Sequence, residues 1–503
     1  MMHTPDTAHT HADGRVDEDL DLIIIGAGFS GIGAAFRISQ RNPGIRYRIL
    51  ERRERIGGTW DLFRYPGVRS DSSIFALSFP WEPWRREEEV ADGADIRDYL
   101  ENTARKRGIF ERIRFRTQVH SADWDSGTDS WTLRANEDGR DTVYRARFVF
   151  FGSGYYNYDE GYTPGFPGIE HFTGTVVHPQ RWPEGLDYSG KKMVVIGSGA
   201  TAVSLVPALA RSAAKVTMLQ RSPTYLFAAA RVNPLVGFLR SFLPLPITHR
   251  IARFTASCFE AMVWALARTA PELAKRIMRR QNASLLPSDY PVDVHFKPRY
   301  NPWDQRICLV ADGDLFSAIS AGKVEVVTDH IDHVDAAGIV LRSGARVDAD
   351  VIVTATGLQL CALGGVRVSV DGAEVKPQER FSYKAYMLED VPNLIWCIGY
   401  TNASWTLRAD MTARAAARLI HHMQSKGYTR ASPHAGSRPL SEKPLWDLQA
   451  GYVLRNPHAL PKSARRRPWI VRQNYFADAL DSLLADRVDE DMVFGRAGGL
   501  SDP

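Results

Sequence analysis

The stretch "DLIIIGAGFSGIGAAFRISQ", residues 21–40, decides the fold of the first part of the chain. An apolar strand is followed by a glycine-rich turn and then by a helical pattern. Gly26, Gly28 and Gly31 have the GxGxxG spacing of a dinucleotide-binding turn. The first glycine permits the tight turn, the second lets a pyrophosphate approach the backbone, and the third lets helix and strand pack closely. We therefore expect a helix N-terminus that faces a dinucleotide phosphate.

The strand after this helix, "YRIL", ends directly before Glu51. This glutamate stands about 20 residues after the last glycine, where an acid accepts hydrogen bonds from the hydroxyls of a ribose. Strand, turn, helix and acid together favour a dinucleotide with a free ribose over a structural turn alone.

A second copy of the pattern follows in "KKMVVIGSGATAVSLVPALA", residues 191–210, where Gly197, Gly199 and Ala202 make GxGxxA. The next strand, "KVTML", is followed by Gln220, Arg221 and Ser222. Arg221 occupies the position that Glu51 has in the first copy. An acid there would repel a 2′-phosphate, whereas an arginine and a hydroxyl would bind it. The second site is therefore predicted to take NADPH.

Two dinucleotide sites in one chain indicate a flavin and its reductant. The apolar strands in "RARFVFFGSGYY", residues 145–156, and "DADVIVTATGL", residues 348–358, flank the second unit. We therefore predict an α/β fold with two Rossmann-like domains, in which the NADPH domain is inserted into the FAD domain. The expected boundaries are a disordered leader at 1–20, the FAD domain at 21–152 and 349–503, the NADPH domain at 153–225 and 297–348, and a helical insertion at 226–296.

The helical insertion is predicted from an apolar repeat. Ile247, Ile251, Phe254, Cys258 and Met262 recur every three or four residues and form one face of a helix. The segment "PLVGFLRSFLPLPI", residues 234–247, is apolar for a surface. We expect it to pack against its own domain, and weak peripheral contact with a membrane or a substrate entrance is the alternative.

Composition sets wider limits. The 503 residues suffice for two or three domains, and the net charge of +5 does not suggest a nucleic-acid binder. The four cysteines form no CxxC pair, so we expect a reduced, cytoplasmic protein without a metal site and without the dithiol of a disulfide reductase. No apolar stretch reaches the length of a membrane span.

Between the two glycine motifs lies "FTGTVVHPQRWP", residues 172–183. It contains Phe172, Gly174, His178 and Trp182 followed by proline, the FxGxxxHxxxW pattern of the type I Baeyer–Villiger monooxygenases. The chain resembles this branch of the flavin-containing monooxygenases, and its ethionamide-activating subgroup in particular, over nearly its whole length. Further segments that carry the resemblance are "GGTWDLFRYPGVRSDS", "GSGYYNYDEGY", "RYNPWDQRICLV" and "GYTNASWTL".

The resemblance implies an FAD-dependent enzyme that consumes NADPH and dioxygen and converts a ketone to an ester or lactone through an anionic C4a-peroxyflavin. It implies that Arg306 supplies the positive charge beside the peroxide, and that Asp71 orients this arginine. Oxygenation of a sulfide, thioamide or amine by the same flavin species remains the alternative. A non-enzymatic flavoprotein is disfavoured because Arg306 and Asp71 occur together.

The resemblance also assigns cofactor contacts, with one departure: Gln305 stands where several relatives have lysine, which leaves more of the 2′-phosphate selectivity to Arg221. For the linker of Phe172, Gly174, His178 and Trp182, a hinge between domains and simple packing remain equally open. The residues expected to contact FAD or NADPH are Gly26, Gly28, Phe29, Ser30, Gly31, Glu51, Gly58, Thr59, Trp60, Arg69, Ser70, Asp71, Val119, Gly197, Ser198, Gly199, Ala200, Thr201, Ala202, Arg221, Ser222, Asp304, Gln305, Thr406 and Leu407.

Overall fold

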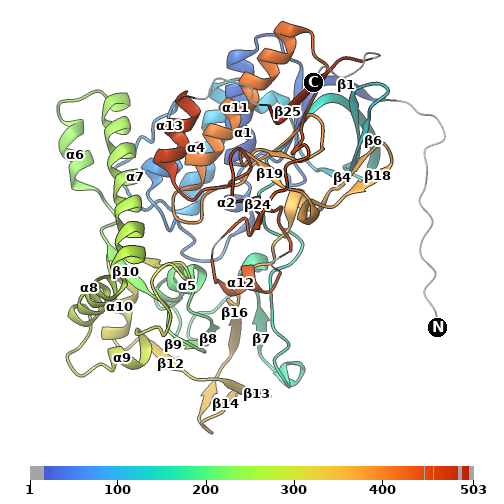
Figure 1. Ribbon diagram of the computed structural model, residues 1–503. Coiled ribbons are helices and arrows are strands. Elements are labelled where there is room, and N and C mark those ends of the chain that lie inside the picture. Colours follow the sequence, from blue (N-terminus) through green and yellow to red (C-terminus); the bar gives the residue numbers. More distant parts are fainter. Residues whose placement is uncertain (1–15, 447, 457, 485–489, 498–503) are drawn as a thin grey trace, which may run out of the picture.

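The computed structural model describes residues 16–446, 448–456, 458–484 and 490–497. Figure 1 shows two α/β bodies, one around the sheet that contains β1 and β6 and the other around β8, β9 and β16. The chain enters the second body after β6 and returns after β16, so the predicted α/β class with one domain inserted into another is confirmed.

The first sheet has the order β18-β17-β4-β5-β6-β1-β2-β3, and β19, β20 and β21 extend it beside β6. β1 pairs in parallel with β2 and β6, and its Leu22, Ile23 and Ile24 are completely buried. Helices α1 and α11 pack together in the core on one face of the sheet. The strands are β1 (Glu18–Ile25), β2 (Tyr47–Leu50), β3 (Ile113–Arg114), β4 (Thr117–Asp125), β5 (Ser130–Glu137), β6 (Arg140–Phe151), β17 (Arg367–Val370), β18 (Ala373–Val375), β19 (Ser382–Tyr383), β20 (Met387–Leu388) and β21 (Leu394–Trp396).

The helices and short strands of this domain come from both ends of the chain. They are α1 (Phe29–Arg41), α2 (Thr59–Leu62), α3 (Ile74–Leu77), α4 (Gly93–Lys106), α11 (Trp405–Lys426), α12 (Gly451–Leu454), α13 (Tyr475–Leu484), β22 (Arg430–Pro433), β23 (Glu442–Lys443), β24 (Ser463–Ala464) and β25 (Met492–Gly495), with 3₁₀ turns at Phe110–Arg112, Ala362–Gly365 and Pro377–Glu379.

The predicted leader, residues 1–20, needs a correction at its end. β1 begins at Glu18, because its backbone continues the ladder with β6 as far as Tyr144, and Asp17 N–H donates to Val143 O at 2.8 Å. Residues 1–15 lie outside the described part of the chain.

The second sheet is entirely parallel, in the order β12-β9-β8-β16-β7. It contains β16, which the sequence analysis assigned to the FAD part; the boundary expected at 348/349 therefore falls after Thr354. Two smaller sheets, β10-β11 and β13-β14-β15, belong to the same domain. The elements of this domain are β7 (Thr175–Val177), β8 (Lys192–Ile196), α5 (Ala200–Leu209), β9 (Lys215–Gln220), β10 (Leu226–Ala229), β11 (Cys308–Ala311), α10 (Asp314–Ser320), β12 (Val324–Thr328), β13 (Ile331–Asp335), β14 (Gly338–Leu341), β15 (Arg346–Asp348) and β16 (Val351–Thr354), with 3₁₀ turns at Ile169–His171 and Pro179–Arg181.

The chain crosses between the domains twice, and the two crossings run side by side. Tyr156 and Leu360 form an antiparallel bridge. Asn157 N–H donates to Gln359 O at 2.9 Å, and Tyr162 N–H donates to Gly357 O at 3.0 Å. The connection is thus a paired ribbon in which each crossing satisfies backbone groups of the other.

The helical insertion is confirmed, but its expected start at residue 226 is too early, because Leu226–Ala229 form β10, which pairs with β11. It consists of α6 (Pro234–Arg240), α7 (Leu245–Thr269), α8 (Pro271–Ser284) and α9 (Val292–His295). Figure 1 shows α7 reaching from the level of the first sheet down to the second. Arg253 fastens its upper part to the first domain, because its Nη1 donates to the carbonyls of Ala76 at 2.6 Å and Ser78 at 2.5 Å.

The expectation that residues 234–247 pack against their own domain is wrong for half of the large apolar side chains, because Leu235, Phe238, Phe242 and Ile247 are exposed. Only Val236 is fully buried, whereas Phe238 is 65% and Phe242 57% exposed. On α7, Phe254 is 62% and Met262 58% exposed. The helical period was correct, but a period alone does not say whether the apolar face meets protein. No helix among the described residues is long and apolar enough to cross a membrane.

Candidate active site

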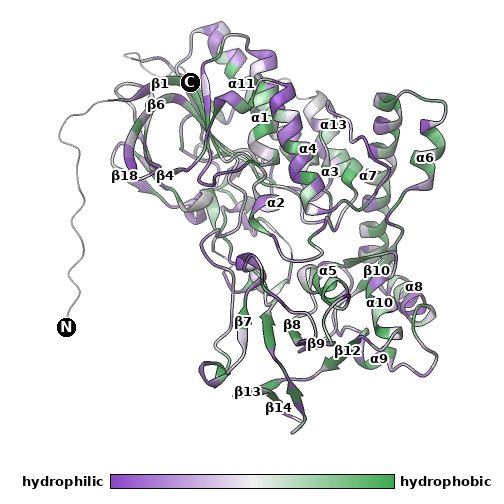
Figure 2. Ribbon diagram, turned by 180° about the vertical axis from the view of Figure 1, so that it is seen from behind, coloured by the Kyte–Doolittle hydropathy of each residue, from purple (hydrophilic) through white to green (hydrophobic). Residues whose placement is uncertain are grey.

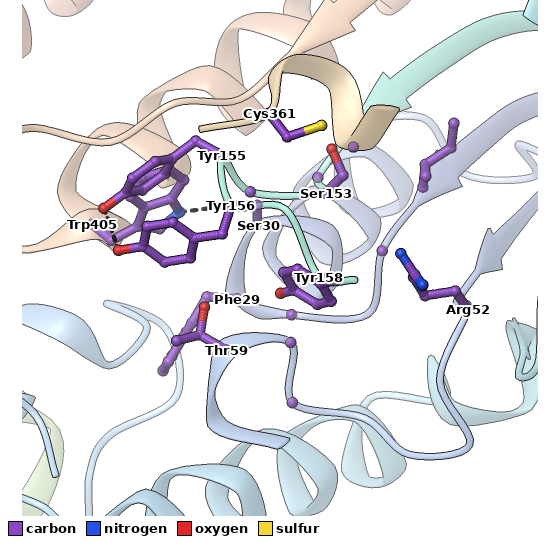
Figure 3. Close-up of a pocket in the computed structure, with 18 of the residues that line it drawn as sticks. Phe29, Ser30, Arg52, Thr59, Ser153, Tyr155, Tyr156, Tyr158, Cys361 and Trp405 are labelled. Carbon is purple, nitrogen blue, oxygen red and sulfur yellow. Dashed lines mark hydrogen bonds between the residues drawn. The ribbon is translucent and has the colours of Figure 1, made fainter. Parts of the chain in front are cut away.

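A cavity of about 550 Å³ lies at the carboxyl ends of β1 and β2, where the first glycine turn meets the first crossing. Figure 3 shows Tyr155, Tyr156 and Trp405 grouped together, with Phe29, Thr59 and Tyr158 below them in the view. In an open parallel sheet this is where a nucleotide binds. The predicted residues that line the cavity are Gly26, Gly28, Phe29, Ser30, Glu51, Gly58, Thr59, Trp60, Asp71, Val119 and Arg306.

The first glycine turn has the geometry that a pyrophosphate needs. Gly26 has φ +99°, and a Cβ on Gly31 would lie 1.9 Å from Gly26 O, so side chains are excluded at both positions. Gly28 is the N-cap of α1, and a Cβ there would lie 3.5 Å from Gly58 Cα. Two glycine backbones thus face each other at a helix N-terminus and leave space for an anion.

Glu51 is buried, with 3% exposure, and its carboxylate reaches back to the glycine turn. Its Oε2 accepts from Ala27 N–H at 2.7 Å and its Oε1 from Arg53 N–H at 2.9 Å. Burial raises the pKa of Glu51, and these two backbone donors oppose the rise. The second lone pair of each oxygen remains for a ribose hydroxyl.

Besides Gly31, which packs against Gly26, four predicted contacts lie outside the lining of this cavity. Arg69 is turned away from the cavity and forms an ion pair with Asp314 at 2.5 Å, because its loop lies between the two domains. Ser70 Oγ accepts from Ala91 N–H at 3.2 Å. Thr406 is buried and donates to Ala76 O at 2.8 Å, and Leu407 is also buried. None of the four lines the cavity.

The residues just before Thr406 line the cavity in its place. Ala403, Ser404 and Trp405 do so because α11 begins at Trp405, so the helix start and its cap face the cavity while the next residues turn inward. Trp405 Nε1 donates to Ser30 Oγ at 2.8 Å, drawn as a dashed line in Figure 3. The motif "GYTNASWTL" located this segment, and only the start of the helix fixed which of its residues are involved.

Arg306 and Asp71 come from the two domains and meet at the cavity. Arg306 Nη2 lies 3.4 Å from Asp71 Oδ2, and about a third of each side chain is exposed. The charge of Asp71 raises the pKa of Arg306 further above its already high value, although burial opposes this. Arg306 Nε is buried without a hydrogen-bond partner among the described residues. A fixed cation with an unused donor is therefore present at the wall of the cavity.

A second cavity, of about 520 Å³, lies on the other side of this ion pair, between α6, α7, α8 and β11. Its wall is mostly apolar and includes Phe259, Val263 and Leu266 of α7. Asp71, Ser72, Arg306 and Ala403 line both cavities. An apolar space and the dinucleotide cavity thus share one wall, and Arg306 is part of it.

Glu260 of α7 also lines the apolar cavity and was not found from the sequence. Its Oε1 accepts from Ser404 Oγ at 2.8 Å and its Oε2 from Ser404 N–H at 3.0 Å, so it caps α11 from the inserted helix. Burial of the carboxyl raises the pKa of Glu260 to about 7, although Arg306 and Arg253 lower it. A single Glu in an apolar helix gives no signal of this in the sequence.

The second glycine turn repeats the design of the first. Gly197 has φ +130°, and a Cβ there would lie 2.3 Å from Ala355 O. Gly199 is the N-cap of α5 and faces open space, while Ala202 is completely buried against the sheet. Ser198 belongs to the turn before α5 that is predicted to bind NADPH, and its Oγ shares a hydrogen bond of 2.8 Å with Thr224 Oγ1. Ala200 and Thr201 form the first turn of α5.

Arg221 and Ser222 are exposed directly after β9. A second cation, Arg455, lies close by, with its guanidinium 3.6 Å from the centre of the Tyr162 ring. Desolvation lowers the pKa of Arg455, and the positive charge of Arg221 contributes to this decrease. The two arginines therefore make a local positive field that only the folded chain reveals.

Asp304 and Gln305 immediately precede Arg306. Asp304 Oδ2 accepts from Asn301 N–H at 3.0 Å, and its Oδ1 accepts from Arg268 at 3.2 Å. The carboxylate of Asp304 thus holds the turn that presents Arg306. Gln305 forms an isolated bridge with Pro302 in the same turn.

The linker residues Phe172, Gly174, His178 and Trp182 have two kinds of neighbour. Some pack within the second domain, and His178 contacts the first crossing between the domains. Phe172 is 9% exposed within a cluster under the second sheet, and a Cβ on Gly174 would lie 2.3 Å from Asp350 O. His178 lies against the first crossing, since a Cβ on Gly161 would be 2.0 Å from its Cε1. Burial lowers the pKa of His178. Trp182 is partly buried and meets Tyr188 edge-on.

Comparison with known proteins agrees with this arrangement. Residues 18–362 match the family described as flavin-binding monooxygenase-like. The FAD-containing monooxygenase EthA of Mycolicibacterium smegmatis is 45% identical over 477 residues, which cover 95% of this chain and 97% of the relative. The enzyme of the same name from Mycobacterium tuberculosis (strain H37Rv) is 46% identical over 462 residues, covering 92% and 94%.

Solved structures share the fold at low identity. A steroid monooxygenase bound to NADP has a TM-score of 0.73 at 22% identity and covers 95% of this chain and 100% of its own. A cyclohexanone monooxygenase bound to ε-caprolactone has a TM-score of 0.74 at 19% identity, with the same coverage. The relatives align over almost their whole length, and the family model spans both dinucleotide motifs. As the resemblance of its motifs indicated, the chain belongs to the flavin-binding monooxygenase-like family.

Proposed function

We propose that the protein binds FAD in the first cavity and NADPH at the second glycine turn, and that it converts a ketone to an ester or lactone with dioxygen. FAD, once reduced by NADPH, supplies the activation of dioxygen. The observation that carries the proposal is the wall shared by the two cavities, where Arg306 lies between the cofactor space and an apolar space.

Arg306 has three properties that suit this role. Its charge is permanent, its partner Asp71 comes from the other domain, and its Nε is free of partners in the described structure. A guanidinium so placed stabilises negative charge that develops on oxygen, and it donates to a carbonyl oxygen that enters from the apolar side. Asp71 is the positioning residue, because its carboxylate pairs with the guanidinium of Arg306 at the wall that the two cavities share.

The apolar cavity suits a substrate without charge, because most of its lining is apolar. Sulfides share this property with ketones, so product analysis must decide between the two. We expect purified protein, supplied with NADPH, dioxygen and a mixed panel of ketones and sulfides, to be yellow and to form esters or lactones. Sulfoxides as the only products would replace the ketone proposal with heteroatom oxygenation, and a protein that takes up no flavin would refute both.

Replacing Arg306 by alanine tests its charge. Arg306→Ala is expected to fold and to bind FAD, but to lose about two to three powers of ten in the rate of ester formation, because a preorganised electrostatic donor is removed. The diagnostic quantity is ester formed per NADPH consumed, measured together with hydrogen peroxide. We expect the ratio to collapse and peroxide to appear.

The control for this variant is Arg279→Ala, which removes an exposed guanidinium of α8 that pairs with Asp293. It should keep the wild-type ratio, and Asp71→Ala should show a milder loss than Arg306→Ala. Wild-type coupling in Arg306→Ala would exclude this arginine from the reaction.

The preference for NADPH tests Arg221. One charge-assisted hydrogen bond contributes about 1.5–3 kcal/mol, or about one to two powers of ten in affinity. Arg221→Ala is therefore expected to raise the KM for NADPH by that factor and to leave the KM for NADH nearly unchanged. Equal losses for both cofactors would remove Arg221 from 2′-phosphate binding. Arg455→Ala is the companion variant, and a similar selective loss would place Arg455 at the same phosphate.

Glu260 makes the stability of the protein depend on pH. Its pKa is about 7 in the folded protein and 4.5 as the ordinary value, so the folded state binds more protons between these values. The free energy of unfolding should therefore fall as pH rises from about 4.5 to about 7, and the loss should be complete above that. In Glu260→Gln the amide still accepts from Ser404 N–H and donates to Ser404 Oγ, but it cannot ionise.

The measurement is the midpoint of thermal unfolding of wild type and Glu260→Gln across pH 5 to 8. We expect the variant to gain relative to wild type as pH rises from 5 to about 7, and the difference to level off above that. Glu272→Gln, on the exposed side of α8, is the control and should run parallel to wild type. Parallel curves for Glu260→Gln would show that its carboxyl titrates normally.

A further inference from the structure

The inserted helices expose a continuous set of large apolar side chains, here called the apolar face. It comprises Phe238 of α6, Phe242 of the following turn, and Ile247, Phe254 and Met262 of α7, whose exposure ranges from 45% to 65%. The Phe238 and Phe242 rings touch edge-on, with centroids 4.9 Å apart. Figure 2 shows α6 and α7 at one edge of the molecule, with apolar stretches on both helices.

The apolar face continues to the mouth of the apolar cavity. Leu235, Phe259 and Ile277 line that cavity and are also 42%, 47% and 43% exposed. Phe259 and Met262 are three residues apart on α7 and so lie on neighbouring positions of the helix surface. A molecule that covered the apolar face would therefore also cover the opening that leads to Arg306.

The charge of the same segment is strongly positive. Exposed Arg250 flanks the apolar stripe of α7, and exposed Arg276 and Arg280 flank Leu273 and Ile277 on α8. By sequence, residues 231–280 carry a net charge of +7, but Arg231, Arg268 and Arg279 pair with Asp92, Asp304 and Asp293 outside the segment, and Arg253 is buried. The exposed positive charge of the segment therefore rests mainly on Arg250, Arg276 and Arg280. Between residues 231 and 280 the basic residues are Arg231, Arg240, Arg250, Arg253, Arg268, Lys275, Arg276, Arg279 and Arg280, and the acidic residues are Glu260 and Glu272.

Aromatic and aliphatic side chains bordered by arginines are the combination that binds the interface of an anionic bilayer. A second copy of the chain fits less well, because a two-fold contact would bring the exposed Arg250, Arg276 and Arg280 of both copies together. We propose that the apolar face docks on an anionic lipid surface, with the mouth of the apolar cavity turned toward the lipid. The contact is peripheral, since no described helix is long and apolar enough to cross a membrane.

Co-sedimentation of the full-length, FAD-loaded protein with lipid vesicles tests this proposal. We expect it to pellet with vesicles of phosphatidylcholine and phosphatidylglycerol in equal parts. It should pellet much less with phosphatidylcholine alone, and salt should weaken the binding because the charges are exposed. Burial of one phenylalanine side chain corresponds to about tenfold or more in partitioning. The double variant Phe238→Ser, Phe242→Ser should therefore lose at least about tenfold in binding.

The matched control is the double variant Val176→Ser, Val294→Ser, which removes two exposed apolar side chains outside the apolar face and should bind as wild type does. Arg276→Gln with Arg280→Gln should lower binding to the anionic vesicles only. Ketone or sulfide oxidation in lipid-free solution should be unchanged in all these variants, so failure of docking would leave the proposed function standing.

Two results would overturn the proposal. One is equal binding of wild type and the Phe238→Ser, Phe242→Ser variant to the anionic vesicles, or no binding by either at low salt. The other is a wild-type dimer in solution, detected by light scattering, that the same variant converts to a monomer. The second result would show that another copy of the chain covers the apolar face.

Discussion

The guanidinium of Arg306 lies in the wall between the dinucleotide cavity and the apolar cavity, and its ion pair with Asp71 links the two domains there. Arg306 belongs to the inserted domain and Asp71 to the first domain, and they meet at 3.4 Å. The guanidinium lines both cavities, and Asp71 supplies its counter-charge. The pair therefore ties the position of the inserted domain to the electrostatics of the site. The ion pair of Arg69 with Asp314 joins the same loop to the other domain at a second point.

The inserted helix α7 serves both domains at once. Arg253 donates to carbonyls at the end of α3 and directly after it, and Glu260 caps α11. Other residues of the helix form part of the wall of the apolar cavity. The first turn of α11 in turn reaches the cofactor cavity through Trp405 and Ser30. A shift of α7 would consequently alter the shape of both cavities. The two crossings between the domains lie side by side at Tyr156 and Leu360, so a rotation of one domain against the other would pass through this paired segment.

Where the structure differs from the sequence-based expectations, it differs in the direction in which side chains point. Thr406 and Leu407 lie in the correct motif, but α11 starts one residue earlier and turns both inward, so Ser404 and Trp405 face the cavity. Arg69 lies next to Asp71, yet it points to the other domain. The stripe on α7 has the predicted helical period but meets solvent. Periodicity and motif spacing describe which residues share a face, and they carry no information about what that face meets.

The sequence by itself determined the two glycine turns, their acidic and basic partners at Glu51 and Arg221, and the order of the domains. These are local features, set by which residues tolerate a positive φ or the close approach of a backbone, so spacing alone reveals them. Only the tertiary structure decided that Arg306 meets Asp71 and that Glu260 lies under the start of α11. These pairs are far apart in the chain, and their contacts exist only because two sheets and an inserted helix pack in one particular way.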